Sequence, residues 1–182
     1  MALKFLLHLI GDLHCPLHVE GLLRGGNDIS VVWKGRDTNL HFVWDVLIPQ
    51  SITNSTEADE HVAAAAWAEQ LWNMTLDDLS PNLLTPPELA NTGDEILGLG
   101  DNAEGLVMRW AGETNAWVCR TVLKDGVDGV KQRELSSKYY TEAISGVEEL
   151  VSNAGWRLAA WVNELARQEA LERNGNGQGE LK

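Results

Sequence analysis

Residues 137–173 read SKYYTEAISGVEELVSNAGWRLAAWVNELARQEALER, and no other part of the sequence is as regular. Apolar side chains recur there at intervals of three and four residues: Tyr140, Ile144, Val147, Val151, Ala154, Leu158, Trp161 and Leu165. Because an α-helix turns once in about 3.6 residues, this spacing predicts one long amphipathic helix that packs along a single stripe. The charged side chains between them are expected on other faces: Glu148, Glu149, Arg157 and Glu164.

Four other segments have helical spacing, and one has the pattern of a hairpin. The helical segments are residues 3–14, read as a buried helix ending near Pro16; 39–48, a short helix stopped by Pro49; 57–73; and 102–123. The hairpin is an apolar run at 29–33 followed by Lys34-Gly35-Arg36-Asp37. Residues 79–100 are expected to form a loop, and residues 174–182 a disordered tail. The prediction is a mainly α fold with one small β-hairpin, in a single domain over residues 1–173.

The composition is that of an ordinary globular protein, with 44% hydrophobic and 23% charged residues among 182. Asp and Glu outnumber Lys and Arg by 27 to 14, which gives a formal net charge of -13. That balance argues against a broad basic face for nucleic acid, although bound divalent metals can supply positive charge locally.

No apolar run reaches the roughly 20 residues of a membrane helix. Residues 1–10 lack the basic flank and the cleavage site of a signal peptide.

Histidine and aspartate are arranged in a pattern that suits metal ions. His8 and Asp12 are four residues apart, and so are His41 and Asp45. On a helix this spacing puts both side chains on one face, one turn apart. His18 follows the first helix, where the chain can turn back toward the same cavity. His18, His41 and Asp45 would form a three-ligand zinc set with an open position, and His8 with Asp12 beside it would make the site multinuclear.

A non-metal interpretation of these residues stands beside this one. A histidine and an aspartate four apart on a helix are often a surface pair or a capped core histidine. Two such pairs in apolar helices favour the metal, because a buried carboxylate is costly unless it is paired or binds a cation. His14 lacks the spacing and is interpreted as structural or as a residue that supports a metal ligand from behind, and His61 is expected to be exposed. The helical tryptophans are expected in the core rather than as platforms for bases.

Two cysteines and two glycosylation sequons bear on the cellular setting. Cys15 and Cys119 are too few for a disulfide framework: they pair with each other, remain thiols, or one lacks its partner. The sequons begin at Asn54 (Asn-Ser-Thr) and at Asn73 (Asn-Met-Thr). Both asparagines are therefore candidate glycosylation sites, which would fit a secreted protein.

Three ordered motifs resemble one known family. Residues 8–18, HLIGDLHCPLH, are similar to the HxxGDxHxPLH segment of the zinc-dependent single-strand nucleases of fungi and plants, the S-one/P-one nuclease family. Residues 25–28, GGND, and residues 39–45, NLHFVWD, resemble its GGND and NLHxxWD motifs. Weaker similarity continues through residues 118–121 and the C-terminal helix, so the resemblance spans most of the chain.

The resemblance implies a multi-helix fold, shared with zinc-dependent phospholipases C, around three zinc ions. It implies a secreted glycoprotein, a hydrolase that acts as an endonuclease on single-stranded DNA and RNA, leaves 5′-phosphate products and serves DNA catabolism. The implied metal ligands are His8, Asp12, His18, His41 and Asp45. The first two would serve two zincs, with Asp12 as the bridging, catalytic carboxylate, and the last three would hold the remaining zinc. Asn27 would help to hold a base.

The departure from the family lies at the front of the chain. Family members have a long stretch before the HxxGD segment, with an N-terminal tryptophan, further zinc ligands, a base-stacking aromatic residue and the disulfide partner of the cysteine that Cys119 matches. The interpretation is a nuclease domain missing its N-terminal part, which by itself holds about one zinc and leaves the helix around His8 uncovered. Two alternatives stay open: a catalytically inactive zinc-binding remnant, and a phosphodiesterase of the phospholipase C kind. No membrane and no specific protein partner is implied.

Overall fold

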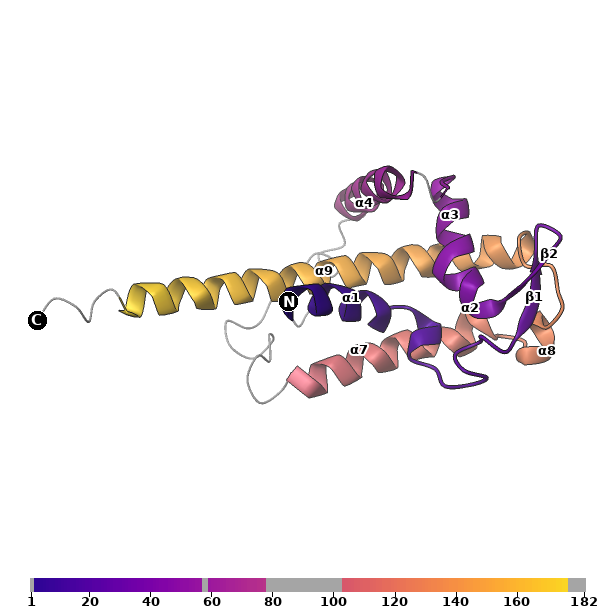
Figure 1. Cartoon of the computed structure of the whole chain (residues 1–182), viewed down its shortest axis with the longest axis horizontal. Helices are drawn as coiled ribbons and strands as arrows, with labels where there is room; N and C mark the ends of the chain where they lie inside the picture. Colours follow the sequence, from indigo (N-terminus) through magenta and orange to yellow (C-terminus); the bar gives the residue numbers. More distant parts are fainter. Residues whose placement is uncertain (1, 57–58, 78–102, 177–182) are drawn as a thin grey trace, which may run out of the picture.

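Helix α9 (Lys138–Asn176) runs along most of the molecule, and the other long helices are arranged around it (Figure 1). The computed structural model describes residues 2–56, 59–77 and 103–176. Helix α1 (Ala2–Leu13) packs against α9 and against α7 (Ala103–Trp117), while α4 (Glu60–Asp77) contacts α9 separately. The predicted C-terminal helix is confirmed. It also includes residues 174–176 of the expected tail, so that expectation is wrong for these three residues.

Short elements connect the long helices. They are the 3-10 helix η1 (Pro16–His18), strands β1 (Ser30–Trp33) and β2 (Arg36–Asn39), helix α2 (Leu40–Phe42), the π-helix η2 (Val43–Leu47), helix α3 (Ile48–Thr53), the π-helix η3 (Val118–Val122) and helix α8 (Val127–Val130). The hairpin and α8 lie at one end of the molecule, beside the start of α9 (Figure 1). The mainly α fold with one small hairpin is therefore confirmed. None of the helices in the described ranges has both the length and the apolar character that a membrane span needs.

The hairpin is antiparallel and forms where the sequence predicts it. Ser30 pairs with Asn39, and Trp33 pairs with Arg36. The two turn residues, Lys34 and Gly35, have φ values of 50° and 74°, the conformation of the type I′ turn that suits the twist of a two-residue hairpin. Residues 132–135 then bond to β1, for example through the Val32 N–H and the Arg133 carbonyl at 2.8 Å. The hairpin is thus attached to the segment that leads into α9.

The core lies where this hairpin, the α2–η2–α3 segment and the first turns of α9 meet. Its buried members are Leu17, Ile29, Val31, Trp33, Leu40, Val43, Trp44, Ile48, Val122, Val130, Leu135, Ala143 and Val147. Trp44 also donates from its indole N–H to the Tyr139 hydroxyl at 2.8 Å, and that hydroxyl donates to the Val122 carbonyl at 3.0 Å. Both polar groups of this buried pair are therefore satisfied, and the segment that carries Asp45 is fixed to α9.

The buried stripe of α9 differs from the predicted one. Val147 is buried as expected, but Val151 and Leu165 are each 39% exposed. Arg157 and Glu164, expected on outer faces, are buried instead. Arg157 can be inside because it is paired there with Glu113 of α7, and Glu164 is bonded to residues one turn along its own helix. Spacing alone could not predict this, because a charged side chain is tolerated inside only when a partner is present.

Two further expectations from the sequence are wrong. Residues 3–14 do form a helix, but α1 is not buried, since the large side chains of Leu3, Phe5, Leu7 and Leu9 are exposed. Pro49 does not stop its helix: it lies in the first turn of α3, directly after a π-helical turn, and α3 continues to Thr53. The predicted loop at residues 79–100 and residues 177–182 of the predicted tail lie outside the described residues.

Candidate metal centre

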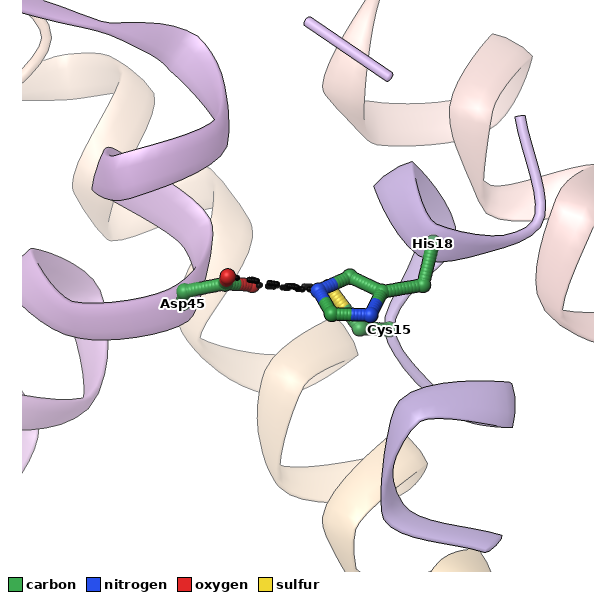
Figure 2. A group of neighbouring side chains, drawn as sticks. All are labelled: Cys15, His18 and Asp45. Carbon is green, nitrogen blue, oxygen red and sulfur yellow. Dashed lines mark hydrogen bonds and ion pairs between the residues drawn. The ribbon is translucent and has the colours of Figure 1, made fainter. Parts of the chain in front are cut away.

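The five predicted metal ligands come from three elements. His8 and Asp12 are on α1, His18 ends η1, and His41 and Asp45 lie one turn apart across the junction of α2 and η2. The structure brings all five into one connected group. Figure 2 shows its centre, where the Asp45 carboxylate and the His18 ring point directly at each other.

The Asp45 carboxylate is the meeting point of two imidazoles. His18 Nε2 lies 3.1 Å and 3.2 Å from its two oxygens, and His41 Nε2 lies 3.1 Å from Oδ2. The two imidazole rings are stacked, with centroids 4.9 Å apart. Asp45 therefore has a donor nitrogen of each predicted histidine ligand within reach.

Asp12 connects the second predicted pair to the first. His8 Nε2 is 3.2 Å from Asp12 Oδ2, and the other oxygen of Asp12 lies 3.6 Å from His18 Nδ1. The His8 side chain is 71% exposed, so this end of the group is open to solvent. An aspartate that faces the outer nitrogen of a metal-binding histidine also fixes the orientation of its ring.

The hydrogen bonds of His41 call for a cation at Asp45. Its Nδ1 lies 2.8 Å from the Gly25 carbonyl, which can only accept, so Nδ1 carries the proton. In the neutral ring, Nε2 then presents a lone pair to the Asp45 carboxylate oxygen 3.1 Å away. Two acceptors in contact repel, so a positive charge, from a proton or a metal ion, is needed between them. The donor set of two imidazoles and a carboxylate is one that zinc prefers, and these residues therefore fit the metal.

A left-handed turn brings the Gly25 carbonyl to His41. Four consecutive residues, Leu23, Arg24, Gly25 and Gly26, have φ values of 49°, 56°, 62° and 81°. A Cβ at Gly25 would lie 2.4 Å from the Leu17 carbonyl oxygen, so the turn requires glycine there. The first glycine of the GGND motif thus acts on the candidate site through its backbone, a role that the sequence interpretation missed.

Asn27 of the same motif is exposed, and its side-chain amide donates to the Arg24 carbonyl at 2.9 Å. This contact closes the left-handed turn, and within the described residues no hydrogen bond involves the side-chain oxygen. In the NLHxxWD motif, Asn39 caps α2, since its side chain accepts from the Phe42 N–H at 2.8 Å. Asp45 itself lies in a π-helical turn, a local geometry that is frequent at functional sites.

Cys15 is a neighbour of the site that sequence reasoning left without a role. Its thiol donates to Asp45 Oδ1 at 3.3 Å, and Cys15, His18 and Asp45 form a group whose potential ligand atoms all lie within 4.8 Å of one another. Burial, and then the nearby negative charge of Asp45, raise the pKa of the thiol to about 12. Its position in the sequence, between the predicted ligands Asp12 and His18, is the signal from which a role could have been predicted. Cys119 is exposed, and neither cysteine forms a disulfide.

His14 lies apart from this group, as a structural histidine should. Its Nδ1 is 2.7 Å from the Ile10 carbonyl, and Arg157 Nη1 donates to its Nε2 at 2.9 Å. Burial lowers its pKa, and this keeps the ring neutral.

His61 is exposed, as expected. Asn54 and Asn73 are also exposed, at the end of α3 and on α4.

Two cavities flank the α2–η2–α3 segment. One of about 250 Å³ reaches Asp45 and Cys15 and is otherwise largely apolar, with Trp44 and Leu150 among its lining residues. The other, of about 570 Å³, lies between the hairpin and α3 and includes Lys34 and Arg36 but none of the five predicted ligands. Only the smaller cavity of this pair touches the candidate site.

Comparison with known proteins places these features in context. The family model described as S1/P1 Nuclease matches residues 1–167. Nuclease S1 of Aspergillus oryzae is 36% identical over 168 residues, which are 92% of this chain and 55% of that protein. Nuclease P1 of Penicillium citrinum is 33% identical over 173 residues (92% and 58%), and Endonuclease 4 of Arabidopsis thaliana is 31% identical over 166 residues (90% and 50%). The chain therefore spans little more than half the length of the curated relatives that it matches.

Proposed function

Because the chain belongs to the S1/P1 nuclease family, we propose that it is a zinc-dependent phosphodiesterase that cleaves single-stranded DNA or RNA to 5′-phosphate products. The observation that carries this proposal is the Asp45 carboxylate, which faces Nε2 of both His18 and His41 at 3.1 Å. His41 cannot donate to it in its neutral form, because its proton is on the nitrogen that faces Gly25. A bound cation satisfies all three side chains at once.

The five predicted side chains divide into two parts of one metal centre. His18, His41 and Asp45 would hold one zinc, while His8 and Asp12 are the described side chains available for further zinc. Bound zinc would supply Lewis acidity toward a phosphate and lower the pKa of a bound water. Asp12 has one oxygen toward His8 and one toward His18, so it is the carboxylate placed to act between the two parts. It is the residue to which we assign the catalytic role.

Substrate recognition is assigned to the GGND turn. This turn holds His41 through the Gly25 carbonyl and carries Asn27, exposed, two residues later. The oxygen of an exposed amide can accept from a base, and the amide carries no charge to repel a phosphate. With a chain charge of -13, attraction of nucleic acid depends on the bound cations.

Two other functions remain to be distinguished by experiment. A phosphodiesterase of the phospholipase C kind would use the same ligands on a lipid, whereas the relatives that the chain matches are named as nucleases. A zinc-binding chain without activity would hold metal at Asp45 alone, and the observation behind this alternative is the high exposure of the His8 side chain.

Activity on matched substrates tests the proposal. The chain is stripped with a chelator, reloaded with zinc, and assayed on single-stranded DNA, RNA, a 3′-nucleotide and phosphatidylcholine vesicles. We expect nucleic acid to be cut to 5′-phosphate ends, and Asp12→Asn to slow this at least about 100-fold. Asp128→Asn, an exposed change on α8, is the control and should retain activity. Turnover of lipid alone would support the phospholipase C alternative, and bound zinc without turnover of any substrate would support the inactive one.

Secretion and N-glycosylation at Asn54 and Asn73 belong to the same proposal. Both acceptor asparagines are exposed, as a glycan requires. Expression through a eukaryotic secretory route, followed by glycosidase treatment, should shift the wild-type mass by two glycans. Asn54→Gln and Asn73→Gln should each remove one of them, and an unshifted wild-type protein would contradict this part of the proposal.

A further inference from the structure

The sulfur of Cys15 lies on the carboxylate that the proposed metal would occupy. Cys15 Sγ is 3.3 Å from Asp45 Oδ1, the same oxygen that His18 Nε2 approaches to 3.1 Å. In Figure 2 the sulfur lies directly behind the His18 ring, on the side of Asp45. The thiol and the two predicted ligands thus converge on one point from two parts of the backbone, the turn at residues 15–18 and the π-helix η2.

The three separations between Asp45 and the other donor atoms approach the ligand–ligand distances of a tetrahedral zinc site. Zinc binds nitrogen and oxygen at about 2.0–2.2 Å and sulfur at about 2.3 Å, so neighbouring ligands of a tetrahedron are about 3.3–3.6 Å apart. Asp45 lies 3.1 Å from each histidine Nε2 and 3.3 Å from Cys15 Sγ. Each contact is within a few tenths of an ångström of the expected edge.

The backbone holds the thiol in this position. Cys15 precedes η1 in an extended conformation, with φ −95° and ψ 120°, and its N–H donates to the Asp12 carbonyl at 3.0 Å. Pro16, directly after it, is fully buried. The His18 N–H donates in turn to the Cys15 carbonyl at 3.0 Å. Cys15 and His18 therefore belong to one rigid turn, and a metal that binds His18 meets the sulfur without rearrangement of the chain.

We infer that Cys15 is the fourth ligand of this metal, so that His18, His41, Asp45 and Cys15 form a closed site with two nitrogens, one oxygen and one sulfur. The inference rests on the metal site of the proposed function. Binding breaks the S–H bond, forms a sulfur–metal bond and releases the proton to solvent. A closed site has no open position for water or substrate. The open coordination positions then lie at the His8–Asp12 end of the group, and thiolate ligation shifts the preference of the Asp45 end toward softer metals.

Cobalt(II) substitution tests this ligand directly. Cobalt occupies tetrahedral zinc sites, and a bound thiolate gives a charge-transfer absorption in the near ultraviolet that nitrogen and oxygen ligands do not give. Cys119→Ser leaves Cys15 as the only thiol of the chain, while Cys15→Ser leaves only the exposed Cys119. The two single variants are therefore matched controls for each other.

We expect the thiolate absorption in wild-type and Cys119→Ser proteins and its loss in Cys15→Ser, with cobalt affinity about tenfold or more weaker. Cobalt bound by Cys119→Ser without this absorption would overturn the inference and leave the metal site of the proposed function standing. The absorption in Cys15→Ser would also overturn it, because the ligand would then be Cys119. Cobalt bound by none of the proteins would refute the proposed metal site together with this inference.

Discussion

At the scale of single residues, the candidate site depends on contacts that fix its rings. His41 is held by a backbone carbonyl on one side and faces Asp45 on the other. That carbonyl belongs to Gly25, which has a φ of +62° and no room for a side chain. Such a residue stabilises a ligand without touching the metal, as the outer contacts of metal sites do.

Gly25→Ala should therefore affect both stability and metal binding. The added methyl group would contact the Leu17 carbonyl and would also hold an alanine at positive φ. We expect a loss of about 2 kcal/mol or more in the free energy of unfolding, measured with urea, and weaker zinc binding. Gly35→Ala is the matched control, because Gly35 also has positive φ (+74°) but open space around it. Gly35→Ala should lower the free energy of unfolding by about 1 kcal/mol and leave the zinc affinity unchanged. Equal losses in the two variants would contradict the proposed packing.

The residue types and spacing predicted which side chains gather in the site, but not how they are held. The two histidine–aspartate pairs are four residues apart on helices, and this geometry can be predicted from sequence alone. The contacts of Gly25 and Cys15 could not be predicted. They depend on a left-handed turn and on the path of the chain after α1, and both are set by packing against Leu17 and Pro16.

At the scale of elements, one carboxylate joins the hairpin to the segment before α9. Glu134 accepts from the Lys34 and Gly35 N–H groups at 3.1 Å and 2.9 Å, and from the Ser136 N–H at 2.8 Å. The hydrogen bond of the Ser136 side chain, followed by that of Gly35 N–H, lowers the pKa of Glu134 to about 2. These bonds hold the turn whose strands lead into the His41 segment.

Glu134→Gln should flatten the acid dependence of stability. The pKa of Glu134 is lower in the folded chain than its ordinary value of 4.5, so the ionised carboxylate stabilises the fold at any pH above 4.5. This contribution to stability is lost as the pH falls from 4.5 toward 2. Thermal unfolding at pH 7 should show a lower melting temperature for the variant, and the gap to wild type should narrow between pH 4.5 and pH 3. Glu149→Gln, an exposed change on α9, is the control. A gap that does not change with pH would contradict this role.

The helix α9 was predictable in extent but not in the face that it buries. Its apolar spacing spans residues 140–165, and the helix is continuous there. The buried face includes Arg157, which contacts Glu113, His14 and the Trp110 ring at once. Glu113 and Trp110 lie on α7 and His14 directly follows α1, so their positions follow from how the helices pack together. A pattern within one helix contains no information about them.

Arg157→Met should separate the helices that this side chain joins. The change keeps the apolar stem but leaves the Glu113 carboxylate and the Nε2 of His14 without their donor. We expect a loss of about 2–3 kcal/mol in the free energy of unfolding, less than for a fully buried pair because the Glu113 side chain is 46% exposed. Urea unfolding of Arg157→Met, Glu113→Gln and the double variant forms the test. Additive losses would show that the pair contributes no coupling energy.

At the scale of the whole molecule, α1 presents apolar side chains to solvent beside the candidate site. Leu3, Phe5, Leu7 and Leu9 are between 44% and 60% exposed, on the helix that also carries His8 and Asp12. An apolar surface of this kind promotes association. We expect sedimentation velocity to show concentration-dependent association of the chain. Phe5→Gln with Leu9→Gln should reduce it, whereas Val62→Gln on exposed α4 should not. A wild-type monomer at all concentrations would contradict this expectation.

The central claim is that the Asp45 carboxylate and its two histidines hold a metal ion, and zinc content measures this most directly. The wild-type chain, Asp45→Asn and the control Asp128→Asn are loaded with zinc, dialysed, and analysed by elemental mass spectrometry. Asn keeps the size of the side chain but removes the charge that two imidazoles share. We predict about one tightly held zinc in wild-type and control chains and almost none in Asp45→Asn. Wild-type protein without zinc, or an Asp45→Asn protein that keeps as much as the wild type, would contradict the account.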